Sequence, residues 1–152
     1  MAKVDVAAKR LRDINPNINV TTIQDFISKD NISQIFGEQK LDYIVDAIDT
    51  VSSKLSIIEY AHTHDVQIIS CMGTGNKLDA SKLEITDISK TSVCPLAKVI
   101  RKELRKLNIP HLKVLYSKEE PVKTGLRTPA SISFVPSVAG LLIAGEVVRS
   151  LI

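Results

Sequence analysis

The sequence has few aromatic residues and few cysteines. It contains no tryptophan, three tyrosines and three phenylalanines, so a nucleic-acid site built on stacked aromatic side chains is not supported. Cys71 and Cys94 form no Cys-x-x-Cys pair, which excludes a paired-cysteine zinc site. Two unpaired cysteines and no secretory signal pattern predict a reducing, cytoplasmic compartment.

Long apolar runs and strong charge are also missing. The apolar runs are too short to suggest a bilayer span, so we expect no membrane contact. Basic residues outnumber acidic residues by 20 to 17, a formal charge of +3. This excess is compatible with a polyanion partner without requiring one. Without repeats or linker-like segments, 152 residues predict one domain over residues 1–152.

Segments with helical and strand periodicity alternate along the chain. Such an order predicts an α/β fold, Rossmann-like, with a mostly parallel sheet and flanking helices. We expect a polar loop over residues 117–130 before the last strand. The predicted helices are 4–14, 27–36, 51–61, 95–107 and 136–152, and the predicted strands are 18–23, 42–49, 66–70, 83–88, 111–116 and 131–134.

Asp49 follows a β-rich apolar segment and precedes Thr50 and two serines. The carboxyl ends of parallel strands are where open α/β sheets bind ligands, so this carboxylate could hold magnesium or orient a phosphate. Alternatively, Asp49 or Thr50 caps the helix that follows. Asp46 lies three residues earlier and is expected to face another way, which does not favour a paired-carboxylate site.

Three other features have both a functional and a structural interpretation. Gly73-Thr74-Gly75 follows a strand as in dinucleotide loops, but the third glycine is missing and a turn explains it. Cys94, just before Pro95, is either a nucleophile or thiol carrier, or a helix cap. The basic side of helix 95–107 either binds nucleic-acid phosphates or is a solvated face. Its members are Lys98, Arg101, Lys102, Arg105 and Lys106.

Four stretches, spread over nearly the whole chain, carry a family resemblance. They are Lys-Val-Asp-Val with Ile-Asn-Pro, Asp-Ala-Ile-Asp-Thr, Lys-Thr-Ser-Val-Cys-Pro-Leu-Ala-Lys-Val-Ile-Arg-Lys-Glu-Leu, and Pro-Ala-Ser-Ile-Ser-Phe-Val-Pro-Ser-Val-Ala-Gly. In these segments the chain resembles the ubiquitin-activating-type (ThiF-like) adenylyltransferase superfamily, and within it the tRNA threonylcarbamoyladenosine dehydratases. Cys94 stands where such relatives are expected to have aspartate, which suits a helix cap.

The resemblance implies an enzyme that uses ATP and magnesium to activate a threonyl carboxylate on tRNA, which then cyclises. Carried over residue by residue, Lys3 would contact phosphates, and Asp49 would lie near the phosphates and magnesium. Lys54 falls near a position that is basic in relatives. A homodimer through the last helix, which is rich in small residues, is also expected.

The resemblance also implies an absence. Relatives begin with a strand, a glycine-rich loop and a helix, which have no counterpart in this sequence. Residues 1–152 are therefore expected to match the C-terminal portion of a single adenylyltransferase domain, incomplete at its N-terminus and inactive by itself. Two alternatives stay open: an adenylyltransferase that activates a ubiquitin-like sulfur-carrier protein in a sulfur relay, and a non-catalytic interaction module that retains the fold.

Overall fold

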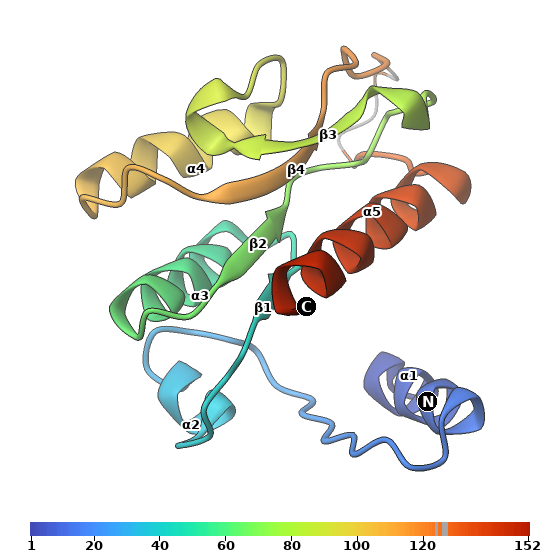
Figure 1. Ribbon diagram of the computed structural model, residues 1–152. Coiled ribbons are helices and arrows are strands. Elements are labelled where there is room, and N and C mark those ends of the chain that lie inside the picture. Colours follow the sequence, from blue (N-terminus) through green and yellow to red (C-terminus); the bar gives the residue numbers. More distant parts are fainter. Residues whose placement is uncertain (124, 126–127) are drawn as a thin grey trace.

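The computed structural model describes residues 1–123, 125 and 128–152, and a four-stranded sheet lies at the centre of this described part (Figure 1). Three strands are parallel, and β3 runs antiparallel to β4. The predicted α/β class and mostly parallel sheet are confirmed, with β3 as the exception. In spatial order the strands are β1 (Ile44–Asp46), β2 (Ile68–Cys71), β4 (Lys113–Ser117) and β3 (Leu83–Asp87).

Helices cover both faces of the sheet (Figure 1). α3 (Val51–Thr63) and α4 (Pro95–Lys106) lie on one face, and α5 (Phe134–Leu151) lies on the other. Successive residues of a strand point to opposite faces, so Val114 of β4 packs with the first pair and Leu115 with α5. The buried partners are Ile58, Ile100 and Leu104 on the α3 and α4 side, and Ile69, Ala139 and Ile143 on the α5 side.

The remaining helices precede the sheet in the chain or connect its strands. α1 (Lys3–Ile14) lies apart from the sheet at the start of the chain, and an extended segment joins it to α2 (Ile32–Phe36) (Figure 1). α2 packs on α3 through Ile32 and Ile57 and ends at Gly37, whose φ of 65° suits glycine. Two short 3-10 helices, η1 (Ala80–Lys82) and η2 (Ile88–Lys90), flank β3.

Two predicted strands are wrong. Residues 18–23 have no regular structure, and Ile18 and Ile23 are 38% and 45% exposed, because period-2 alternation does not supply the neighbouring strand that a ladder requires. Residues 131–133 are irregular and α5 already begins at Phe134. Pro136 lies within the first turn, where a missing N–H costs nothing, so it did not mark the start of the helix. Of the predicted loop 117–130, residues 124, 126 and 127 lie outside the described residues.

The strand that leads to Asp49 is shorter than predicted and lies at the edge of the described sheet. β1 has three residues and is an edge strand, with Val45 48% exposed between buried Ile44 and Asp46. The apolar composition of this segment does not distinguish an edge strand from a central one. The carboxyl end of β1 nevertheless leads to Asp49, at the end of the sheet where the sequence placed this residue.

α5 departs from the expectation that no segment could span a membrane. By length and composition alone it could cross one, with 18 residues and a mean hydropathy of 1.5. One such helix is weak evidence, because helices that pack on a soluble core meet the same test. Here Val135, Ala139 and Ile143 are buried, while Leu141 is 73% exposed.

Candidate functional site

The carboxyl ends of β1, β2 and β4 meet at one edge of the sheet. The segments that leave this edge are residues 47–50, residues 72–79 and the described residues between 118 and 133. Asp49 lies in the first of them and is exposed to solvent. Since ligands of open α/β sheets bind outside the carboxyl ends of the strands, this edge is the candidate site.

The helix-capping interpretation of Asp49 and Thr50 does not account for these residues. Thr50 is the N-cap residue of α3, yet it makes no side-chain hydrogen bond to the helix. Among the described residues, none donates a hydrogen bond to the Asp49 carboxylate. The thirteen-residue helix α3 therefore starts without a side-chain cap beside a free carboxylate. An uncapped N-terminus favours anions, and a carboxylate favours a cation, so the pair suits a magnesium-phosphate group.

A buried ion pair supports the loop that carries Asp49. Lys54 Nζ donates to Asp46 Oδ2 at 2.7 Å, and both side chains are 0% exposed. Ser70 Oγ donates to the same carboxylate oxygen at 2.5 Å, and the backbone N–H of Ile48 donates to Oδ1 at 3.3 Å. Asp46 thus ties the end of β1 to β2, to α3 and to the loop before Asp49. As expected, Asp46 and Asp49 face different ways.

Lys54 lies beneath the site and does not project into it. Besides Asp46, its ammonium group contacts Ser70 Oγ at 3.1 Å and the carbonyl oxygen of Cys71 at 2.9 Å. An ammonium has three N–H donors, and three partners are present. A phosphate could contact Lys54 only by displacing one of them. The predicted nucleotide contact of Lys54 therefore stays a prediction, whereas its structural role is visible.

The pKa of the Cys71 thiol depends on its burial and on the charged groups near the carboxyl ends of the strands. Burial raises the pKa of the Cys71 thiol to about 11, the Lys54 ammonium opposes this rise, and the carboxylates of Asp46 and Asp49 add to it. These three charges therefore act on the end of β2. Lys3 is not part of this group: it is exposed on α1, and no hydrogen bond or ion pair joins it to another described residue.

Raising a thiol pKa predicts a pH dependence of stability. The folded state holds the Cys71 proton more tightly than the unfolded chain, whose thiol titrates near pH 9. The free energy of unfolding should therefore fall between pH 9 and about 11, by up to ~2–3 kcal/mol. Urea unfolding of the wild type and of Cys71→Ser at several pH values measures this. Identical slopes for the two proteins would contradict the expectation.

The sequence did not identify the residues that fix the second loop. Asn76, at a φ of 55°, exchanges hydrogen bonds with Ala130: its N–H donates to the Ala130 carbonyl at 2.7 Å, and its side-chain oxygen accepts from the Ala130 N–H at 2.8 Å. Lys77 Nζ donates to the carbonyl oxygen of Glu119, and burial lowers the pKa of this lysine. A Cβ on Gly75 would lie 2.8 Å from Pro129. Gly73-Thr74-Gly75 thus leads into a turn, as predicted.

Cys94 is a helix cap. It is the N-cap residue of α4, and its Sγ accepts a hydrogen bond from the Ala97 N–H at 3.5 Å. The side chain is buried, with 6% of the residue exposed. A thiol that carries a transferred group must be accessible, so this geometry does not favour the thiol-carrier interpretation.

Comparisons with known proteins agree with this architecture. The sequence profile of the ThiF family matches residues 1–152. The tRNA threonylcarbamoyladenosine dehydratase of Bacillus subtilis is 36% identical over 168 residues, covering 99% of this chain and 66% of the relative. The Escherichia coli protein of the same name is 35% identical over 105 residues, covering 69% of this chain and 39% of the relative. The chain thus spans less than two thirds of the length of each of these relatives.

Solved structures are similar over almost the whole chain. The E. coli tRNA N6-threonylcarbamoyladenosine dehydratase TcdA in complex with AMP gives a TM-score of 0.92 at 26% identity, covering 99% of this chain and 64% of that one. Its complex with ATP gives a TM-score of 0.90 at 27% identity, covering 99% and 63%. Those neighbours bind adenine nucleotides and share the arrangement of sheet and helices described above.

Proposed function

Since this chain belongs to the ThiF family, we propose that it provides part of an ATP-dependent dehydratase that cyclises threonylcarbamoyladenosine beside the anticodon of tRNA. The observation that carries the proposal is the free Asp49 carboxylate at the uncapped start of α3, on the edge where the sheet is expected to bind ligands. The similarity to the Bacillus subtilis dehydratase supports the substrate. We also propose that the protein acts in the cytoplasm.

Over the whole proposed reaction, the modified adenosine loses the elements of water and ATP becomes AMP and pyrophosphate. The threonyl carboxylate attacks the α-phosphorus of ATP, and pyrophosphate leaves, which gives an acyl adenylate. An atom of the same side chain then attacks the acyl carbon, loses its proton, and displaces AMP, which keeps one carboxylate oxygen. Such chemistry depends mainly on positioning the reactants and on neutralising phosphate charge.

The chain's own residues have distinct parts in this proposal. Asp49 would hold magnesium, which supplies positive charge at the phosphate oxygens. Magnesium commonly binds through one or two carboxylates together with substrate phosphates, so a single free aspartate fits. Lys3 is proposed to contact phosphates. Lys54 would act indirectly. Its positive charge lies below the site, and its ion pair with Asp46 holds the loop that carries Asp49.

Partners are part of the proposal as well. ATP and tRNA follow from the reaction, and a second copy of the chain is proposed to cover the outer side of α5, where large apolar residues are exposed. Sedimentation velocity tests the homodimer. A sulfur-carrier protein, the alternative partner, is less favoured because Cys94 is buried. The exposed apolar residues of α5 are Phe134, Leu141, Leu142, Val148 and Leu151.

A fused protein tests the function directly. By resemblance, residues 1–152 form the later part of one adenylyltransferase domain, so the polypeptide alone should bind magnesium-ATP more weakly than micromolar in calorimetry. Fused behind the glycine-rich segment of the Bacillus subtilis relative, it should form the cyclised nucleoside. Mass spectrometry of digested tRNA would show a nucleoside lighter by one water, only with ATP and magnesium. No product from the fusion would refute the proposal.

A further inference from the structure

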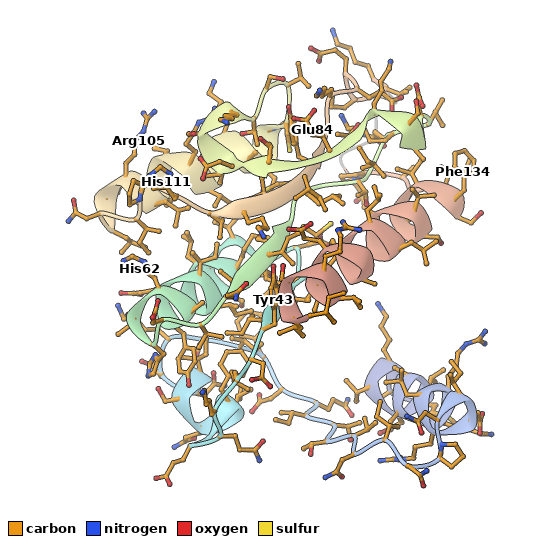
Figure 2. All side chains as sticks on the ribbon, viewed as in Figure 1. Tyr43, His62, Glu84, Arg105, His111 and Phe134 are labelled. Carbon is orange, nitrogen blue, oxygen red and sulfur yellow. The ribbon has the colours of Figure 1, made fainter. Side chains whose placement is uncertain are left out.

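Three basic side chains form a row on the outer surface of α4. Lys98, Lys102 and Arg105, here called the α4 stripe, are spaced four and three residues apart, which places them on one side of a helix. All three are exposed. The helical rise separates Lys98 from Arg105 by about 10 Å along the axis. Figure 2 shows Arg105 projecting from α4 away from the sheet.

The α4 stripe has no anionic partner within the described part of the chain. The one acidic residue of α4 is Glu103, and it pairs with Lys106 at 2.7 Å. Some lysines elsewhere are paired, for example Lys113 with Glu146 at 2.6 Å. Like charges three or four residues apart on a helix repel each other. The stripe therefore costs some stability in the free protein, and an anion bound across it would remove that cost.

The helix under the stripe is held rigidly. Arg101 borders the stripe, but its side chain turns toward η2, where its Nη1 donates to the carbonyl oxygens of Ile88 and Thr91 at 3.2 and 3.1 Å and to Thr91 Oγ1 at 2.6 Å. These bonds tie α4 to η2. The apolar side of the helix is buried through Ala97, Ile100 and Leu104. Arg101 thus belongs to the scaffold, and the stripe cations keep a fixed spacing.

We propose that the α4 stripe binds the phosphate backbone of RNA. This inference rests on the proposed function in taking tRNA as the RNA. Three cations in a row match a linear series of phosphates, and the arginine can bind one phosphate through two hydrogen bonds. Because α4 offers no aromatic side chain for base stacking, the contact reads the backbone and positions the RNA without selecting a sequence.

The test measures how tightly the 152-residue chain binds a fluorescently labelled tRNA transcript. Fluorescence anisotropy gives the affinity at salt concentrations between 50 and 200 mM. Lys98→Gln/Lys102→Gln/Arg105→Gln should weaken binding about tenfold or more at 150 mM salt. Each phosphate contact contributes ~0.9 to the slope of log affinity against log salt, so the slope should fall by about 2–3. Circular dichroism checks that the triple variant keeps its fold. If it does not, the binding of tRNA by the single variant Lys102→Gln is measured instead.

The matched control removes three charges elsewhere. Lys9→Gln/Arg10→Gln/Lys40→Gln changes exposed residues of α1 and of the segment before β1, and should alter affinity less than threefold. Equal losses for the two triple variants would overturn the proposal, and so would no tRNA binding by the wild type. Binding to phosphatidylglycerol vesicles in place of tRNA would also refute it. The assay contains no ATP and measures no product, so its outcome is independent of the dehydratase test.

Discussion

Lys54→Met is expected to lower the free energy of unfolding by about 3–5 kcal/mol, because it leaves the Asp46 carboxylate buried without its counter-charge. Domains of this size are stable by only about 5–15 kcal/mol, so the variant should be partly unfolded or should unfold at much lower urea concentration. Urea titration followed by circular dichroism measures the difference.

Two controls separate the charge from the packing. Asp46→Asn/Lys54→Met removes both charges and leaves an acceptor for Ser70, so it should be more stable than Lys54→Met alone. Lys29→Met breaks an exposed pair with Glu59, at 3.0 Å, and should cost less than ~1 kcal/mol. A loss below ~1 kcal/mol for Lys54→Met would show that the buried pair does not hold this edge together.

Asp49→Asn is expected to reduce product formation by the fused protein about 100-fold or more, with little change in stability. Removing one group that stabilises charge in a transition state commonly costs ~10²–10³ in rate, and Asp49 would act in this way through the magnesium that it holds. The asparagine keeps the size of the side chain but binds magnesium weakly, so the magnesium concentration for half-maximal rate should rise. Rates at several magnesium concentrations measure both effects.

Asp42→Asn is the matched control for this substitution. Asp42 is exposed and lies shortly before β1, at the opposite end of the strand from Asp49. Its substitution should leave the rate and the magnesium dependence unchanged. Urea unfolding of Asp49→Asn should match the wild type, because no described residue donates a hydrogen bond to that carboxylate. Unchanged turnover in Asp49→Asn would remove this residue from the proposed magnesium site.

Local periodicity predicted most elements of this fold correctly. The helices α1, α3 and α4 begin and end within a few residues of their predicted bounds, because apolar residues at helical spacing act over short distances, as do Pro16 after α1 and Pro95 at the start of α4. The same alternation placed Asp49 beyond the carboxyl end of β1. It failed for residues 18–23, where a strand needed a neighbour that no local pattern supplies.

The sequence by itself determined the α/β class, the carboxyl-edge position of Asp49 and the position of Cys94 just before a helix. Only the tertiary structure decided that Lys54 lies buried against Asp46 and Ser70, residues 8 and 16 positions away. It also decided that Arg101 supports α4, while Lys98, Lys102 and Arg105 face solvent with no ionic partner among the residues that the structure describes. The physical reason is that a charged residue type fixes neither its burial nor its partner. Both depend on which distant segments the packed sheet and helices bring together.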